Sequence, residues 1–160
     1  GVKGSAFTYA QGKLVFWSAD PKLVDKDGKA VKEMKFNKCA VADPKLAPYG
    51  EAAYETLKSL KLLDKYQPKF VTGNNIGKTF QFVKTGNAEV GFVALSQVYK
   101  NGKIPEAPRS IVPSKYYQPI RQDAVLLKHG EKSAAAKSFL KFLQSAEANK
   151  LKQSYGYATH

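Results

Sequence analysis

The hydrophobic positions of the chain follow two patterns, which alternate along its first part. Short apolar runs, typical of strands buried on both faces, occupy Leu14–Trp17, Cys39–Ala42, Lys69–Val71 and Val90–Leu95. Between them, apolar residues recur every three or four positions and predict helices from about Tyr49 to Leu60 and from Asn75 to about Lys84. Strands that alternate with helices predict an α/β fold, with short parallel strands and helices packed on the faces of the sheet.

The remaining segments predict loops, one more strand and a helical tail. Residues 19–33 are polar with an Asp-Gly turn signal, and residues 101–113 hold three prolines, so both segments are predicted as loops, the second with a short extended piece at Ile111–Val112. A last strand is predicted at Asp123–Lys128, and helices are predicted at Ala136–Leu143 and Glu147–Ser154. We expect an isolated chain to self-associate through the apolar face of helix Ala136–Leu143, because large exposed patches bind partners.

The charge of the chain narrows the classes of partner. Its 160 residues include 26 lysines and arginines against 13 aspartates and glutamates, a net charge of +13. Such a charge attracts anions, nucleic acids or acidic surfaces. Only Arg109 and Arg121 are arginines, however, and the lysines are scattered. Because base readout and phosphate clamping favour arginine, we expect no nucleic-acid partner, and a basic interaction protein stays open as an alternative.

The sequence contains no recognisable catalytic or metal-binding pattern. The single cysteine, Cys39, lies in an apolar run without a CxxC partner, which predicts a small buried side chain. No local motif places a nucleophile beside His129 or His160, and no Gly-rich phosphate loop occurs. The sequence therefore predicts neither an enzyme nor a resident cofactor.

Two predicted helix starts are the best candidates for a binding site. One is the Ala47–Gly50 segment, and the other is the turn at Val71–Gly77. The first N–H groups of a helix lack partners inside it, and its aligned peptides place about half a positive charge there. Two such ends at the carboxyl edge of one sheet would bind an anion. Tyr49 would add an aromatic wall or a hydroxyl donor, and Gly50 and Gly77 would let the anion approach the backbone closely. Because helix starts follow strands in every α/β protein, this pattern alone leaves the ligand open.

Five runs of the chain, taken in order, resemble the periplasmic molybdate-binding proteins of ABC transporters. The runs are Asp43–Ala53, Val71–Ile76, Thr85–Gln97, Pro119–Val125 and Ser154–Tyr157. Each run is weak alone, but five in the family's order are specific. The resemblance implies an α/β, periplasmic-binding-protein-like fold of type II, in which two lobes close over one oxyanion. It implies that this chain is one full lobe plus the C-terminal return segment of the other.

The resemblance also implies how the chain is organised. Residues 13–117 match the second lobe, whereas residues 1–12 and 118–160 match a crossing strand and the C-terminal part of the first lobe. The N-terminal segment of the family's first lobe has no counterpart here, so we expect half of the site to be absent. The implied partners are the oxyanion, the membrane subunits of an ABC transporter, and the missing segment or a second chain. The implied location is periplasmic, or extracellular with a membrane anchor.

The site residues implied by the resemblance lie at the two helix starts. Tyr49 matches a position whose backbone, and in some members side chain, donates to the oxyanion, and Ile76 matches one whose backbone N–H donates. These two are also the only metal ligands implied, the metal being the molybdenum of bound molybdate. Other members have a liganding tyrosine where this chain has Ala94, so the sequence resembles the branch that uses Tyr49. The residues expected to surround the ligands are Pro48, Gly50, Asn75 and Gly77.

A site made only of donors favours molybdate or tungstate. Molybdate is a tetrahedral dianion without protons at neutral pH, so nothing in the site has to accept a hydrogen bond. Phosphate would bring an O–H among donors, and an unpaired buried polar group costs about 1–3 kcal/mol. Sulfate is also fully ionised and differs by size, so a binding protein for sulfate or another anion is an alternative.

Overall fold

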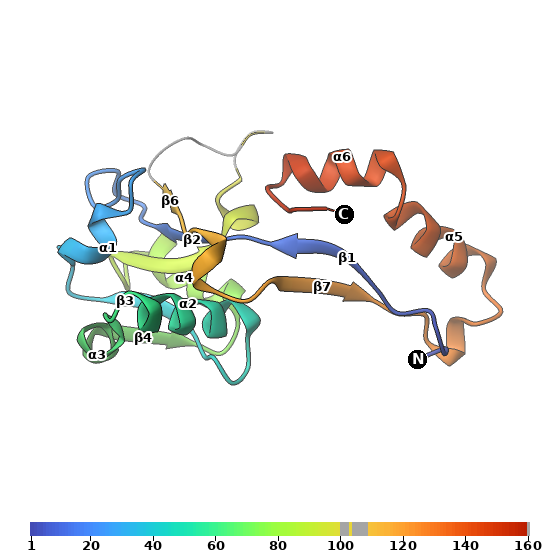
Figure 1. The fold of residues 1–160 in the computed structure, drawn as a ribbon, viewed down its shortest axis with the longest axis horizontal. Coiled ribbons are helices and arrows are strands. Elements are labelled where there is room, and N and C mark those ends of the chain that lie inside the picture. The colour runs from blue at the N-terminus through green and yellow to red at the C-terminus, as the bar shows by residue number, and fades with distance from the viewer. Residues whose placement is uncertain (100–102, 104–108, 160) are drawn as a thin grey trace.

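The molecule is elongated, with a sheet at one end and a narrow ribbon that extends from it (Figure 1). The computed structural model describes residues 1–99, 103 and 109–159. The sheet has five strands, and the ribbon consists of β1 (Phe7–Gly12) and β7 (Ile120–Ala124). Helix α6 (Ala146–Ser154) lies beside the ribbon, where Lys152 donates a hydrogen bond to the Tyr9 carbonyl, and helix α5 (Ala134–Leu143) lies toward the far end. Both tail helices were predicted, and each ends at the predicted residue.

The sheet is mixed, because one of its strands runs against the others. Its order is β4-β3-β5-β2-β6, with bounds Phe70–Gly73 (β4), Cys39–Ala42 (β3), Val90–Ala94 (β5), Leu14–Trp17 (β2) and Arg109–Ile111 (β6). β3 pairs in parallel with β4 and β5, whereas β2 pairs antiparallel with β5 and β6. The predicted parallel pairing was therefore wrong for β2. A strand buried on both faces carries no pattern that shows its direction, and β2 follows the ribbon instead of a crossover helix.

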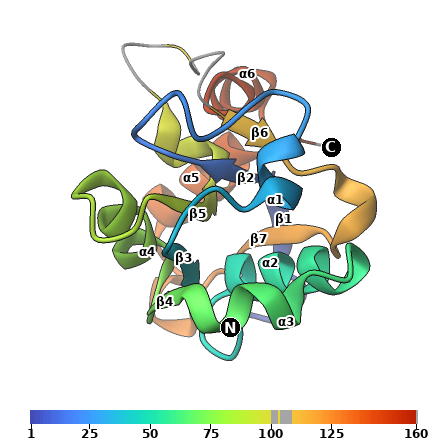
Figure 2. The same cartoon turned by 90° about the vertical axis from the view of Figure 1, so that its left-hand side faces the viewer.

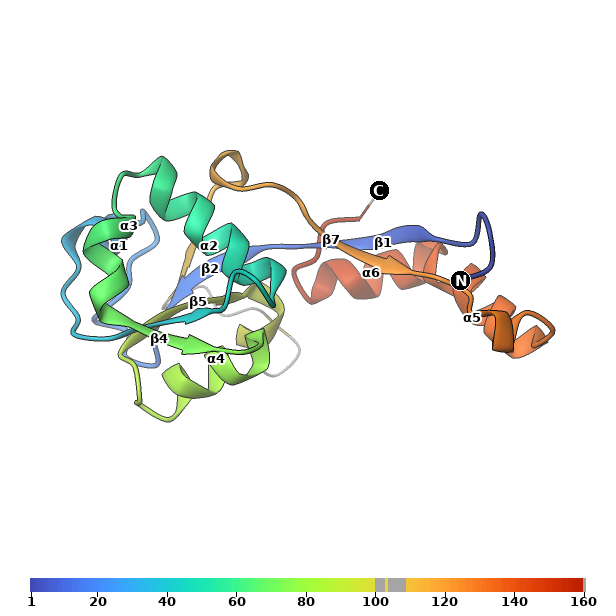
Figure 3. The same cartoon turned by 90° about the horizontal axis from the view of Figure 1, so that it is seen from below.

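Two helices cover opposite faces of the sheet (Figures 2 and 3). α2 (Pro48–Ser59) follows β3 and α4 (Ile76–Lys84) follows β4, and each boundary lies within one residue of the prediction. The shorter elements are helices α1 (Lys29–Glu33) and α3 (Leu63–Tyr66) and the 3-10 turns η1 (Gln67–Lys69), η2 (Leu95–Val98), η3 (Ser114–Tyr116) and η4 (Lys128–Gly130).

The segment predicted as a loop at residues 19–33 contains α1. The Asp25 carboxylate accepts hydrogen bonds from the N–H groups of Lys29 (3.0 Å) and Ala30 (2.7 Å), which fixes the start of this helix. Five residues are too few to produce a periodic apolar pattern, so the sequence did not indicate it. The predicted loop at residues 101–113 lies partly outside the described residues, and its described part contains β6.

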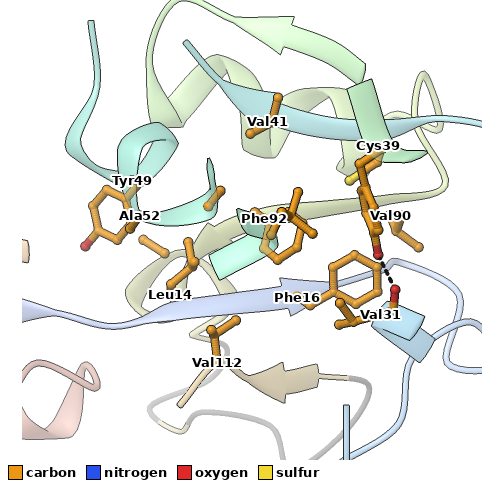
Figure 4. Close-up of a cluster of buried hydrophobic side chains, with 14 of the residues drawn as sticks. Leu14, Phe16, Val31, Cys39, Val41, Tyr49, Ala52, Val90, Phe92 and Val112 are labelled. Atoms are coloured by element: carbon orange, nitrogen blue, oxygen red, sulfur yellow. Dashed lines mark hydrogen bonds between the residues drawn. The ribbon is translucent and has the colours of Figure 1, made fainter. Parts of the chain in front are cut away.

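A cluster of buried side chains joins the sheet to α2 (Figure 4). Phe16 and Phe92, on neighbouring strands, have ring centroids 5.1 Å apart, and the Tyr66 ring lies 6.0 Å from Phe92. Cys39 is fully buried as a free thiol, which confirms its predicted role. The Tyr66 hydroxyl donates a 2.7 Å hydrogen bond to the Val31 carbonyl, so its polar end is satisfied inside the core.

The stability of the chain is expected to fall above about pH 10, the ordinary pKa of tyrosine, in part through Tyr66. Burial, and then the nearby Cys39, raises the pKa of the Tyr66 phenol in the folded chain. As the pH rises, the unfolded chain therefore releases this proton first, which favours unfolding. A Tyr66→Phe variant should lose about 1 kcal/mol at neutral pH, because the Val31 carbonyl loses its donor, yet decline less steeply in alkali. Urea unfolding at a series of pH values checks this, and parallel curves for the two proteins would contradict it.

The ribbon differs from what the pattern of apolar residues predicts. That pattern did not indicate β1, although the resemblance implied a crossing strand within residues 1–12. β7 begins at Ile120 and ends at Ala124, whereas the predicted strand was Asp123–Lys128. The two strands pair antiparallel, from Phe7 opposite Ala124 to Gly12 opposite Ile120. Most of β7 is polar and only partly buried, so its residues resemble those of a loop. The apolar residues that suggested a strand follow β7 instead of forming it.

Candidate anion-binding site

The two helix starts lie at one edge of the sheet. β3 and β4 are parallel neighbours, and their register pairs the last residues of the two strands, Ala42 and Gly73. The Asp43 N–H then donates a 2.8 Å hydrogen bond to the Gly73 carbonyl, which ties the two following turns together. Both helices begin at the end of the sheet that faces the ribbon (Figure 3). The structure thus places the starts of α2 and α4 side by side.

The start of α2 has one N–H group without a partner. Its N-cap, Ala47, is extended and has no capping side chain, and Pro48 at the first helical position has no N–H. The N–H groups of Gly50 and Glu51 donate to the Ala47 carbonyl at 3.0 and 3.2 Å. Within residues 1–99, 103 and 109–159, the Tyr49 N–H has no hydrogen-bond partner. This turn therefore offers the Tyr49 N–H to a ligand.

The start of α4 has two such groups. Asn75 is the N-cap, and its side chain accepts a 2.8 Å hydrogen bond from the Lys78 N–H. Its carbonyl accepts another, of 3.1 Å, from the Thr79 N–H. Among the described residues, nothing accepts from the N–H groups of Ile76 and Gly77. The cap therefore satisfies the third N–H of the helix and leaves the first two exposed at the positive end of the helix dipole.

The Tyr49 ring belongs to the buried core, and its hydroxyl points out of it (Figure 4). The hydroxyl lies against Gly12, where β1 ends, and a Cβ at that position would overlap it. Burial, and then the nearby phenols of Tyr157, Tyr117 and Tyr9, raises the pKa of the Tyr49 hydroxyl. It therefore stays protonated at neutral pH and can donate a hydrogen bond. In the described part of the chain it has no hydrogen-bond partner.

The two glycines of the predicted site have different surroundings. A Cβ at Gly50 would overlap the Ala42 carbonyl oxygen and lie 2.7 Å from the carbonyl carbon, because α2 packs directly on the end of β3. The glycine at position 50 therefore allows close packing between two parts of the fold, and its place beside the ligand stays a prediction. Gly77 is exposed, and a Cβ there would meet the Asn75 side-chain oxygen at 3.3 Å.

Two residues near the helix starts were missed in the sequence. Asp43 precedes the start of α2, and its carboxylate accepts a 2.8 Å hydrogen bond from the Lys45 N–H. Gln97, on η2, donates a 3.0 Å hydrogen bond from Nε2 to the Ile76 carbonyl. Its place at the end of the run Thr85–Gln97 was the only signal for Gln97. Its contact with Ile76 spans 21 positions, which no local spacing reveals.

The chemistry of these helix starts is that of neutral donors. In the residues that the structure covers, no group of three or more His, Cys, Asp or Glu side chains could hold a metal ion. His129 is exposed on η4, and His160 lies outside the described residues. Backbone N–H groups and one phenol are therefore what the edge of the sheet presents to a ligand.

Comparison with known proteins decides the family. The sequence model of the bacterial extracellular solute-binding proteins matches residues 1–158. The chain belongs to this family. It is 48% identical over 156 residues to the molybdate-binding protein ModA of Azotobacter vinelandii, and 52% identical over 159 residues to ModA of Rhodobacter capsulatus. Its structure matches that of the Azotobacter vinelandii periplasmic molybdate-binding protein with a TM-score of 0.91 at 38% identity.

The chain is shorter than these relatives. The two alignments cover 98% and 99% of the chain but 62% and 61% of the relatives, and the structural match covers 99% of the chain and 70% of the solved one. The chain thus spans about three fifths of the length of the two ModA proteins. The matches confirm the predicted resemblance and the periplasmic-binding-protein fold, of which this chain forms a part.

Proposed function

We propose that this chain captures a tetrahedral oxyanion, molybdate or tungstate, for an ABC importer, with Tyr49 and Ile76 as direct ligands. The observation that carries the proposal is the set of unpaired N–H groups on Tyr49, Ile76 and Gly77 at two neighbouring helix starts. Such groups bind anions readily, because the helix dipole adds to their hydrogen bonds. The names of the two ModA relatives support the choice of ligand. The role is capture and delivery, without a reaction or a resident cofactor.

The four neighbouring residues take separate parts in this proposal. Pro48 begins α2 and has no N–H group to donate, and Gly50 allows the helix to pack closely against β3. Asn75 caps α4 in the way that leaves the Ile76 N–H free. Gly77, with its own unpaired N–H and no side chain, is a third donor to the anion.

Selection among anions would follow from the shortage of acceptors. Neither helix-start segment, Ala47–Gly50 or Val71–Gly77, contains a carboxylate, and the Asp43 carboxylate before α2 accepts a hydrogen bond from the Lys45 N–H. The O–H of a protonated phosphate would therefore face donors, at a cost of about 1–3 kcal/mol. Sulfate carries no proton and would be distinguished by the size of the closed cavity.

We propose that residues 13–117 are the second lobe and that residues 1–12 and 118–160 belong to the first. Three strands of chain pass between the two: β1, β7 and the C-terminal end, where the Ala158 N–H donates to the Gln11 carbonyl at 2.9 Å. Closure of the lobes would exclude water from the anion and strengthen its hydrogen bonds. The membrane subunits of the transporter would recognise the closed state.

The proposed location is the periplasm, or the outer surface with a membrane anchor. The family's description and the relatives' names support an extracytoplasmic place. Across the described residues, no helix has the length and apolar character needed to cross a membrane. The net charge of +13 would attract anions toward the site from a distance, an effect that salt weakens.

An apolar surface at the far end of the molecule has no cover. α5 has no buried residue, and Phe139 and Phe142 are 59% and 41% exposed. With the chain after β7, including Leu127, the helix lines a groove of about 430 Å³. We propose that the part of the family fold that this chain does not span covers this surface in the complete binding protein.

The isolated chain is expected to self-associate through this surface, because an exposed apolar face of this kind binds to another copy when its partner is absent. A Phe139→Glu substitution should shift the chain to monomer by placing a charge in the contact. The matched control is Ser138→Glu, which adds the same charge on the neighbouring exposed position and should behave as the unchanged chain. Sedimentation velocity distinguishes the species, and a monomeric unchanged chain would contradict the expectation.

Titration with molybdate, followed by the fluorescence of Trp17, tests the proposed function. Trp17 is a suitable reporter because its ring stacks on Phe80 of α4, with centroids 5.1 Å apart. The titration should be run on the chain alone and on the chain joined to the N-terminal part of the Azotobacter vinelandii relative. We expect saturable binding in the joined protein that a matching concentration of sulfate or phosphate does not displace. Failure of the joined protein to bind would overturn the proposal.

The same titration separates the alternatives. Equal competition by sulfate would indicate a binding protein for another anion. Binding of nucleic acid or an acidic surface that weakens steeply with salt, and that a substitution at Ile76 leaves unchanged, would indicate a basic interaction protein.

A further inference from the structure

The side chain of Gln97 links two elements at the edge of the sheet where the free N–H groups lie. Gln97 belongs to η2, which follows β5, and β5 is the parallel neighbour of β3. Its Oε1 accepts a 3.0 Å hydrogen bond from the Ala94 N–H, and its Nε2 donates one of 3.0 Å to the Ile76 carbonyl. One amide therefore connects the end of β5 with the first residue of α4, through a donor and an acceptor at once.

The Ile76 carbonyl belongs to the same peptide group as the Gly77 N–H. Because a peptide group is planar, fixing the direction of this carbonyl also fixes the direction of the N–H on its opposite side. A hydrogen bond accepted by the carbonyl also polarises the group, which makes its N–H a stronger donor. Gln97 thus acts on one of the free N–H groups of α4 without lying among them.

We propose that Gln97 is a positioning residue of the oxyanion site, which aims and strengthens the Gly77 N–H through the Ile76 carbonyl. This inference rests on the proposed function. The position requires glutamine because it needs one donor and one acceptor. Leucine supplies neither. An ionised glutamate still accepts the hydrogen bond from the Ala94 N–H, but its other oxygen cannot donate to the Ile76 carbonyl and repels it.

Two-dimensional NMR of the amide groups tests the proposal, because it reports weak binding residue by residue. In the chain joined to the N-terminal part of the Azotobacter vinelandii relative, with Gln97 unchanged, molybdate should shift the amide signals of Tyr49, Ile76 and Gly77. In Gln97→Leu the affinity read from these shifts should fall about tenfold, the usual effect of a lost hydrogen bond that supports a charged ligand. The thermal midpoint should change by no more than about 4 °C.

A Gln97→Glu variant gives a readout that a merely structural role would not produce. Without any anion, its Gly77 amide signal should move away from the position in the unchanged chain at neutral pH. It should return as the pH falls through the glutamate pKa, ordinarily about 4, because the protonated carboxyl can again donate to the Ile76 carbonyl. The matched control is Gln81→Glu, the same change at an exposed position on α4, which should leave the Gly77 signal and the affinity unchanged.

The possible outcomes separate this inference from the proposed function. If molybdate shifts the amide signals of the joined protein but Gln97→Leu binds equally well, Gln97 is not a positioning residue. The inference is also wrong if the Gly77 amide signal of Gln97→Glu does not change with pH. It is equally wrong if the Gly77 signal of Gln81→Glu changes with pH to the same extent. If molybdate leaves all three amide signals of the joined protein in place, the proposed function fails and the inference fails with it.

Discussion

A Gly50→Ala substitution is expected to destabilise the chain by about 3 kcal/mol, more than any other single methyl group added to the helix starts. The added Cβ would overlap the Ala42 carbonyl oxygen and would lie 2.7 and 2.9 Å from the carbonyl carbons of Ala42 and Asp43. These are backbone atoms of β3 and the turn after it, and β3 is held in register by β4 and β5. Because they cannot move aside as a flexible side chain can, α2 must shift away from the sheet.

Urea unfolding followed by circular dichroism measures this loss. Gly77→Ala is the matched control, since it adds the same methyl group to the first turn of the other helix. There the nearest atom is the Asn75 side-chain oxygen at 3.3 Å, and alanine favours a helix more than glycine does, so stability should stay within about 1 kcal/mol. Equal losses at the two glycines would show that helix packing on β3 does not limit position 50.

An Ile76→Pro substitution is expected to weaken oxyanion binding about 10- to 100-fold while leaving the fold intact. Proline removes the Ile76 N–H, and a hydrogen bond to a charged group contributes about 1.5–3 kcal/mol. The first position of a helix tolerates proline, because the N–H lost there has no partner inside the helix. Asn75 before it is extended, with φ −155° and ψ 168°, which suits a residue that precedes proline.

Titration of the joined protein with molybdate gives the affinity, and thermal unfolding gives the stability. Ile76→Val is the control, because it keeps the N–H and shortens the side chain by one methylene group. Its affinity should stay near that of the unchanged protein. If Ile76→Pro binds molybdate as tightly as Ile76→Val, the Ile76 N–H is not a ligand, and the assignment of this helix start is wrong.

Local patterns in the sequence were sufficient for most elements. The apolar runs predicted β2, β3 and β5, and helical spacing predicted α2 and α4, because these patterns arise from neighbours within a few positions. The ribbon was the main failure. β7 is mostly polar, and both strands are stabilised by pairing between residues more than a hundred positions apart, such as Thr8 and Asp123, which no local pattern reveals.

The candidate site divides in the same way. The sequence indicated both helix starts and named Tyr49 and Ile76, through motifs that lie within single turns. It did not show which N–H groups are free, since this depends on the Asn75 side chain choosing the Lys78 N–H. It also did not show that α2 packs on β3 at Gly50.

The sequence by itself determined where the four longer helices lie, which runs are buried, and that two helix starts could offer donors to an anion. These features depend on local backbone conformation and on the spacing of apolar side chains. Only the tertiary structure decided the direction of β2, the placement of the Tyr49 hydroxyl against Gly12 and the link from Gln97 to Ile76. Each of these joins residues that are distant in the chain, and such contacts form only when the sheet brings its strand ends together.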